Sequence, residues 1–216
     1  MKKLLEIADS DFLASLKRLA RRKSYSENQI IFSEGDQSDF LPVVERGKIK
    51  MVRYPDVDKE VIIGIFESGE MFAIPPVFDG APYPSTAVAM EETTLLLLCR
   101  KDFLHLLKES SEFSFAVIAW MCEMLREKTA TIKNLATASP EQRVGNVLLR
   151  LAEKEGAAAG DAVKISLRRQ DIAEMAGLTT ETTIRVIRKL AEKNLVKIVH
   201  GKIILEQSTR LRRFLS

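Results

Sequence analysis

The amino-acid sequence predicts an α+β protein, with an antiparallel β-sandwich or roll first, a long helix in the middle and a helix-turn-helix near the C-terminal end. From about residue 23 to residue 100, short apolar or alternating runs are separated by turn residues, which is typical of antiparallel strands. From residue 101 onward the apolar residues recur at the spacing of helices. Residues 167–193 predict two short helices around a tight turn.

The predicted β-region contains the segments QIIF, FLPVVERG, KIKMVRY, EVIIGIF and STAVAMEETTLLLLC. Polar, turn-forming segments lie between them. Four glycines occupy natural turn positions because glycine tolerates positive φ; they are Gly35, Gly47, Gly69 and Gly80. Residues 9–21, before this region, predict short helices.

The middle of the chain predicts a short helix over residues 102–107 and a long one over about 111–136. Apolar residues recur along the long helix as an a/d heptad seam, interrupted by one lysine. The seam consists of Ile118, Met121, Leu125, Lys128, Ile132 and Leu135. Such a seam needs a partner, which is either its own domain or a second copy of the chain. We favour a parallel homodimer, because a protein with a single helix-turn-helix gains affinity and register by pairing.

The strongest single motif is the predicted helix-turn-helix. Its first helix includes residues 171–175, and Gly177 ends that helix. Thr179 then stands where an N-cap belongs, three residues before Thr182. In proteins with this motif the second helix lies in the DNA major groove, and its N-terminal turns contact base edges.

The second helix of the motif has two distinct faces. Its apolar face is formed by Ile184, Ile187, Leu190 and Ala191. Glu181, Arg185 and Arg188 share an exposed stripe elsewhere on the helix.

The flanking segments predict the remainder of this region. Ser139 is a good N-cap, Pro140 suits the first helical position and Gln142 completes a capping box, so residues 137–139 predict a domain boundary and a hinge. A GAAAG loop and the strand VKISL follow the new helix. LVKIVH and KIILE around Gly201 then predict a β-hairpin wing, and STRLRRFL predicts a short basic helix.

The charge distribution favours a nucleic-acid partner. The net charge of +3 hides an asymmetry, because residues 140–216 contain 15 Lys and Arg against 9 Asp and Glu, whereas residues 1–139 contain 18 against 21. A basic C-terminal part beside a mildly acidic N-terminal part fits a DNA-binding domain attached to another domain.

Other classes of protein are not supported by the sequence. No Ser-His-Asp set, metal-spaced cluster, P-loop or dinucleotide fingerprint occurs, so we do not expect an enzyme. No signal peptide or apolar run of transmembrane length is present. We therefore expect no membrane partner. Cys99 and Cys122 form neither a CxxC pair nor a disulfide framework, which indicates a reducing cytoplasm, and we expect both to be buried.

Nearly the whole chain resembles the CRP/FNR family of bacterial transcription regulators. The resemblance rests on FSEGDQSDFLPVVERGKIKMV, SGEMF, KNLATASPEQRVGNVLLRLA, RQDIAEMAGLTTETTIRVIRKLAEKNLV and the HGK turn, in that order. It implies a cyclic-nucleotide-binding-like β-roll over residues 1–110, a dimerisation helix and hinge over 111–138, and a winged helix-turn-helix over 139–216. It also implies an effector-controlled homodimer on palindromic double-stranded DNA, with RNA polymerase as a partner.

The resemblance assigns roles to residues of the helix-turn-helix. Glu181 and Arg185 match the pair that contacts a G·C base pair in each half-site, and the chemistry agrees, because a carboxylate accepts from cytosine N4 and a guanidinium donates to guanine. Thr180 and Ile184 depart from the patterns of the two main subgroups, so only a TGA-like half-site core is expected, with Thr180 beside the reading pair. The positions that match phosphate-binding residues are Arg169, Gln170, Thr179 and Thr182.

The sequence of the predicted β-roll differs from that of the family members that bind cyclic AMP. Gly69 and Glu70 are present, but Pro84 and Ser85 occupy the place of an Arg-Ser pair whose arginine neutralises the cyclic phosphate. We therefore expect an unknown small effector other than cyclic AMP, in an apolar pocket. The candidate pocket residues are Gly69, Glu70, Phe72, Tyr83, Ser85, Thr86, Lys128 and Thr129.

Two alternatives remain open from the sequence. One is a haem-based sensor of carbon monoxide or nitric oxide in the same family, for which His105 and His200 are poorly placed ligands and a Met, Cys or Tyr ligand is not excluded. The other is a cyclic-nucleotide-binding-like module that regulates a partner protein, which would need no recognition helix.

Overall fold

The computed structural model describes residues 16, 18–56, 59–154 and 162–215, without the side chains of residues 59, 134–136 and 154. Most of the first predicted helical stretch, the GAAAG loop and the side chain of Leu135 lie outside this range. The chain divides into two compact units, residues 1–125 and residues 126–216. The division falls inside the long helix α5 (Ser111–Thr137), and each unit is described by itself below.

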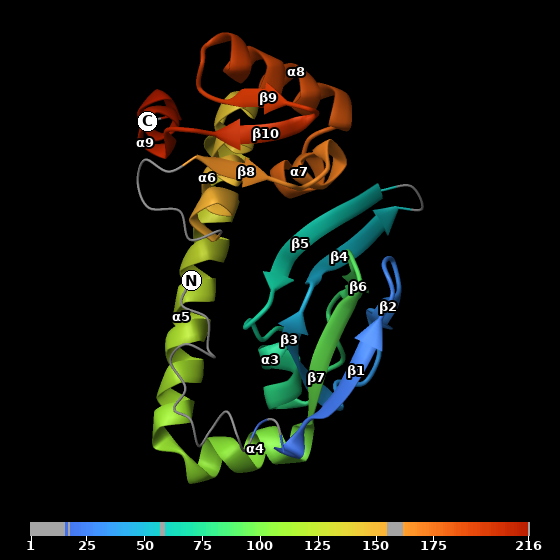
Figure 1. Ribbon diagram of the computed structural model, residues 1–216. Helices are drawn as coiled ribbons and strands as arrows, with labels where there is room; N and C mark the ends of the chain where they lie inside the picture. The colour runs from blue at the N-terminus through green and yellow to red at the C-terminus, as the bar shows by residue number, and fades with distance from the viewer. Residues whose placement is uncertain (1–15, 17, 57–58, 155–161, 216) are drawn as a thin grey trace. The chain divides into compact units, whose positions relative to one another are not determined.

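Two antiparallel sheets form the first unit (Figure 1). One sheet has the order β1–β7–β3, made of β1 (Arg21–Tyr25), β7 (Thr93–Cys99) and β3 (Phe40–Arg46). The other has the order β2–β6–β4–β5, made of β2 (Ile30–Phe32), β6 (Thr86–Ala89), β4 (Lys48–Asp56) and β5 (Lys59–Glu67). The predicted antiparallel β-roll is confirmed.

Two elements of this unit have no counterpart in the prediction. Strand β1 pairs with β7, but its segment RRKSY is exposed at four of five positions and so carries no apolar pattern. Helix α3 (Ile74–Asp79) has prolines in its first turn, where the backbone N–H groups need no helical partner, and Gly80 ends it at φ 82°. Because proline usually interrupts helices, the Pro-rich composition of this segment gave no indication of a helix.

The core of the first unit lies between the sheets and under two helices. Its largest fully buried side chains include Phe72, Tyr83, Leu95 and Phe103. Helix α4 (Arg100–Glu109) contributes Phe103 to this core, and the first half of α5 contributes Phe113, Val117 and Trp120. All four glycines predicted at turns have positive φ, from 82° to 91°, which confirms their role.

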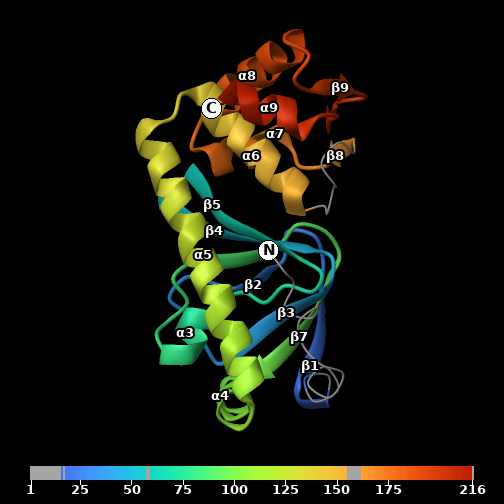
Figure 2. The same ribbon diagram turned by 90° about the vertical axis from the view of Figure 1, so that its left-hand side faces the viewer.

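The second unit contains the end of α5 and a winged helix-turn-helix. Its elements after α5 are α6 (Pro140–Lys154), β8 (Val163–Ile165), α7 (Arg169–Ala176), α8 (Thr180–Glu192), β9 (Lys197–Val199), β10 (Lys202–Leu205) and α9 (Ser208–Leu215). The sheet order is β8–β10–β9. Helix α9 packs beside α6 (Figure 2), and the apolar sides of the helices bury one continuous core.

The start of α6 confirms the predicted capping box. The backbone N–H of Gln142 donates to Ser139 Oγ at 3.3 Å, and the backbone N–H of Ser139 donates to Gln142 Oε1 at 2.9 Å. These reciprocal bonds satisfy backbone donors that a helix start leaves without intrahelical partners.

The prediction of buried cysteines is wrong. Cys99 and Cys122 are both exposed and free. Cys99 is the last residue of β7, directly before α4, and Cys122 lies on α5 two residues after the buried Trp120, on another side of the helix. Small size and apolar character alone do not show which helical face a cysteine occupies.

Candidate nucleic-acid interface and sensor

Two local interactions form the turn of the helix-turn-helix. Gly177 adopts φ 61°, and its N–H donates to the carbonyls of Ala173 and Glu174 at the end of α7. Thr179 then caps α8, because its Oγ1 accepts from the N–H of Thr182 at 3.2 Å. Both predicted signals, the glycine and the N-cap threonine, are therefore confirmed.

Helix α8 presents charged side chains on the side away from its buried face. The buried face consists of Thr183, Val186, Ile187 and Leu190, with Ile184 half-buried beside it. Glu181, Arg185 and Arg188 are exposed, as expected. Arg185 Nη2 lies 3.5 Å from Thr182 Oγ1, and the half-buried Thr180 is the first residue of the helix. The predicted base-reading residues thus share the N-terminal turns of α8.

The wing is held against the start of α7. His200 and Gly201 connect β9 to β10 with φ values of 47° and 74°, as in two-residue hairpin turns with positive φ at both positions. Arg169 Nη2 donates to the Gly201 carbonyl at 3.2 Å. Burial lowers the pKa of the Arg169 guanidinium, which nevertheless stays charged, because arginine titrates far above neutral pH.

The predicted phosphate-binding residues lie at the starts of the two helices. Thr179 and Thr182 are joined through their hydroxyls at 3.0 Å, while Gln170 Nε2 donates to Glu174 Oε1 at 2.9 Å.

Asp171 is a structural residue whose role the sequence did not predict. Its buried carboxylate accepts from the backbone and the guanidinium of Arg168 at 3.0–3.1 Å. The signal was an acidic residue three positions after a predicted helix start.

In the first unit, the predicted effector residues Phe72 and Tyr83 are buried in a cluster of aromatic rings. The rings of Phe32 and Tyr83 stack at 3.7 Å between centroids, and the rings of Phe40 and Phe72 each lie about 6 Å from that of Phe32. The Tyr83 hydroxyl donates to the Phe40 carbonyl at 2.6 Å, and burial is the main cause that raises its pKa well above the usual range. The ring cluster is apolar, and the nearby charges of Asp39 and Asp36 contribute to the raised pKa of Tyr83.

The polar members of the predicted pocket are also enclosed. Gly69 turns the chain at φ 89°, and the buried carboxylate of Glu70 accepts from the N–H of Glu67 at 2.8 Å. Thr86 Oγ1 accepts from the N–H of Glu34 at 3.0 Å. The buried hydroxyl of Ser85 has no hydrogen-bond partner among the residues that the structure describes. Buried hydroxyls are rarely left in this state.

The remaining predicted ligand and effector residues belong to other elements of the chain. His105 is exposed on α4, and His200 is exposed in the wing turn. Lys128 and Thr129 belong to the second unit, so their membership of the effector pocket stays a prediction. Across the described part of the chain, no group of three or more His, Cys, Asp or Glu side chains is arranged to hold a metal ion. No helix in that part is long and apolar enough to cross a membrane.

Two family profiles match the chain in the order of its two units. Residues 22–110 match the cyclic nucleotide-binding domain, and residues 142–214 match the Crp-like helix-turn-helix domain. The chain is 28% identical over 191 residues to the cyclic AMP receptor protein of Thermus thermophilus, in a match that covers 88% of this chain and 86% of the relative.

Solved structures share the fold. FixK2 from Bradyrhizobium japonicum superposes with a TM-score of 0.79 at 20% identity, covering 90% of this chain and 96% of that one. The c-di-GMP-responsive global regulator CLP of Xanthomonas campestris gives a TM-score of 0.77 at 20% identity, covering 91% and 99%. With both domains matched in order, the chain belongs to the CRP/FNR family of transcription regulators and carries that family's helix-turn-helix DNA-binding domain.

Proposed function

We propose that this chain is an effector-controlled, homodimeric regulator that recognises a palindromic DNA site with TGA-like half-site cores. The observation that carries the proposal is the exposed pair Glu181 and Arg185, one turn apart at the N-terminal end of α8. The carboxylate suits cytosine N4 and the guanidinium suits the O6 and N7 atoms of guanine. Two recognition helices in a dimer would reach successive major grooves about 34 Å apart.

The remaining predicted interface residues support this proposal because their positions suit contacts with the DNA backbone. Arg169, Gln170, Thr179 and Thr182 stand at helix starts, where backbone N–H groups and the helix dipole favour phosphate oxygens. The wing turn at Gly201 is fixed to Arg169 and so has a defined position beside α7. We expect these groups to set the register of the protein and to carry no sequence information.

The test is a fluorescence-anisotropy titration of the full-length protein against a palindrome with TGA half-sites. Glu181→Ala and Arg185→Ala should each weaken binding by roughly tenfold to a hundredfold, because a good base contact contributes about 1–3 kcal/mol. Glu192→Ala, exposed at the last position of α8, and Arg210→Ala, exposed on α9, are the matched controls. Parent-like binding by both reading variants would refute the base-reading assignment.

For the sensor, we propose a small, largely apolar effector in the β-roll rather than cyclic AMP. By the resemblance, Pro84 stands where cyclic-AMP-binding members have the phosphate-binding arginine. The stacked rings of Phe32 and Tyr83 lie nearby, with the carboxylates of Asp36 and Asp39 close enough to act on Tyr83. A phosphate in such surroundings without a cation would cost several kcal/mol. The Ser85 hydroxyl offers a buried polar contact for a ligand.

This part of the proposal is tested by calorimetric titration with cyclic AMP, together with native mass spectrometry and an absorption spectrum of the purified protein. We expect no saturable heat from cyclic AMP and no Soret band. Micromolar cyclic-AMP binding would overturn the assignment of the effector class, while a Soret band would establish the haem alternative.

A further inference from the structure

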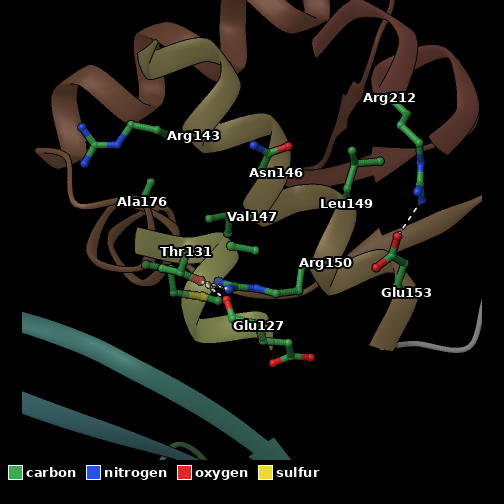
Figure 3. A pocket seen from close by; sticks show the side chains of 12 residues that line it. Glu127, Thr131, Arg143, Asn146, Val147, Leu149, Arg150, Glu153, Ala176 and Arg212 are labelled. Atoms are coloured by element: carbon green, nitrogen blue, oxygen red, sulfur yellow. Dashed lines mark hydrogen bonds and ion pairs between the residues drawn. The ribbon is translucent and has the colours of Figure 1, made fainter. Parts of the chain in front are cut away.

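A pocket of about 320 Å³ opens in the second unit, on the side of α6 that faces the end of α5 (Figure 3). It lies apart from the predicted base-reading residues of α8, none of which lines it. Helices α5, α6, α7 and α9 all contribute to its wall. The lining residues are Glu127, Ala130, Thr131, Arg143, Asn146, Val147, Leu149, Arg150, Glu153, Met175, Ala176 and Arg212.

The wall of this pocket combines an apolar part with three guanidinium groups. Two of the arginines have clear structural partners. Arg212 pairs with Glu153 at 2.6 Å, and Arg143 Nη2 donates to the Gly177 carbonyl at 2.8 Å. The third, Arg150, reaches into the middle of the pocket (Figure 3).

Arg150 has unused hydrogen-bonding capacity. Within the described residues its guanidinium makes one hydrogen bond, from Nη1 to Thr131 Oγ1 at 3.3 Å, and the Thr131 hydroxyl in turn donates to the Glu127 carbonyl at 2.9 Å. A guanidinium carries five N–H donors in a planar fork. Burial is the larger influence on the Arg150 pKa and lowers it, while the nearby charge of Glu127 opposes this. The site therefore holds a partly desolvated cation that is short of acceptors.

A planar fork with free donors matches the two oxygens of a carboxylate or phosphate group. The apolar part of the wall, with Val147 and Met175 on adjacent helices, suits an apolar body attached to such a group. A volume of about 320 Å³ is at the small end of the range for ligand pockets. Glu127 also lines the pocket, and its negative charge would lower the affinity for an anion without preventing its binding.

We propose that this pocket is a binding site for a small organic anion, whose carboxylate or phosphate group is held by Arg150 and whose apolar part packs against Val147 and Met175. It is distinct from the predicted effector site, because none of the predicted effector residues lines it. The proposal does not depend on the identity of the β-roll effector.

The test uses phenyl phosphate and benzoate as probes, since each carries an anionic group on a small apolar ring. The full-length protein is labelled with ¹³C at the methionine methyl groups, and Met175 is assigned through Met175→Leu. Saturable shifts of the Met175 signal locate binding at the pocket, and calorimetry gives the dissociation constant. Inorganic phosphate, which lacks the apolar body, should bind more weakly than phenyl phosphate.

Three variants decide the outcome. Arg150→Met should weaken probe binding by roughly tenfold or more, the value of a charge-assisted hydrogen bond. Ala130→Phe, at an exposed position of α5, should block the pocket while Arg150 is retained. Glu127→Gln should tighten binding about two- to fivefold, because it removes a repulsive charge.

Arg185→Met and Arg210→Met, which remove exposed guanidinium groups outside the pocket, are the controls and should leave the Met175 shift unchanged. A Met175 shift that persists in both Arg150→Met and Ala130→Phe would overturn the proposal. So would the absence of a saturable shift with either probe, or a shift lost in Arg185→Met and kept in Arg150→Met.

Discussion

Arg169 and Gly201 join the start of α7 to the wing. The guanidinium of Arg169 donates to the Gly201 carbonyl at 3.2 Å, although the two residues are 32 positions apart in the sequence. Because both residues of the wing turn have positive φ, this bond holds a tightly bent segment at a fixed place beside the helix-turn-helix. One arginine can thereby support the wing and present its remaining N–H donors to a phosphate.

Replacing this arginine by methionine should weaken DNA binding without changing sequence preference. We expect Arg169→Met to lower affinity for the palindrome and for unrelated DNA by a similar factor, and to reduce the slope of log K against log salt by about 0.9, the value for one lost phosphate contact. Anisotropy titrations at several salt concentrations measure both quantities. Arg210→Met is the control, and an unchanged slope would restrict Arg169 to supporting the wing.

The predicted dimer seam can be tested at two isoleucines of α5. The side chains of Ile118 and Ile132 are 55% and 68% exposed in the single chain, which fits residues that a second copy would cover. Ile118→Lys or Ile132→Lys should shift the protein from dimer to monomer in sedimentation-velocity experiments and weaken binding to the palindrome. Ala119→Lys, an exposed neighbour outside the seam, should remain dimeric. A dimeric Ile118→Lys, Ile132→Lys double variant would contradict the seam.

The sequence predicted the C-terminal unit more completely than the β-roll. Gly177, Thr179 and the Ser139–Gln142 pair are local signals, because each bonds to a backbone group only three or four residues away. Such signals need no knowledge of distant contacts. The helix-turn-helix and its preceding helix were therefore predicted nearly to their ends.

Other features depend on contacts between residues far apart in the sequence, which no local pattern contains. Strand β1 exists because it pairs with β7, about seventy positions later, and its exposed residues carry no apolar signature. The bond from Arg169 to the wing and the pocket around Arg150 likewise join separate helices and turns. The sequence shows that aromatic residues occur near Tyr83, but it does not show how their rings pack against one another.

Two turn glycines offer a matched test of backbone strain against steric crowding. Gly47 and Gly35 have similar φ values of 91° and 89°, but a Cβ on Gly47 would lie 2.5 Å from Thr93 Oγ1 and 2.7 Å from the Glu92 carbonyl, whereas one on Gly35 would meet nothing within 4 Å. We expect Gly35→Ala to destabilise the β-roll by about 1–2 kcal/mol, the cost of a left-handed alanine. Gly47→Ala should cost roughly 1–3 kcal/mol more.

Urea denaturation, followed by signals from the β-roll, measures this difference. Equal losses in the two variants would show that the contact with Thr93 relaxes without cost. A loss confined to Gly47→Ala would show that strain at positive φ contributes little at these turns.

The ion pair between Glu141 and Lys189 should make the stability of the second unit depend on pH in the acid range. Lys189 Nζ lies 2.6 Å from Glu141 Oε1 and joins the recognition helix α8 to the first turn of α6. The hydrogen bond from Lys189 is the main cause that lowers the pKa of Glu141 below its usual 4.5. A lowered pKa in the folded state stabilises the fold above the unfolded-state pKa, and this contribution is lost as the pH falls through the folded-state pKa.

The free energy of unfolding of the parent should therefore exceed that of Glu141→Gln by about 0.2–1 kcal/mol near neutral pH, since more than half of the Lys189 side chain is exposed and water screens the pair. The difference should shrink below about pH 4.5 and at high salt. Lys189→Met should reproduce the loss in an otherwise parent background and add little to Glu141→Gln, whereas Glu192→Gln, at the far end of α8, should not. A difference that persists unchanged at pH 3 would mean that Glu141 acts through the helix start and not through its charge.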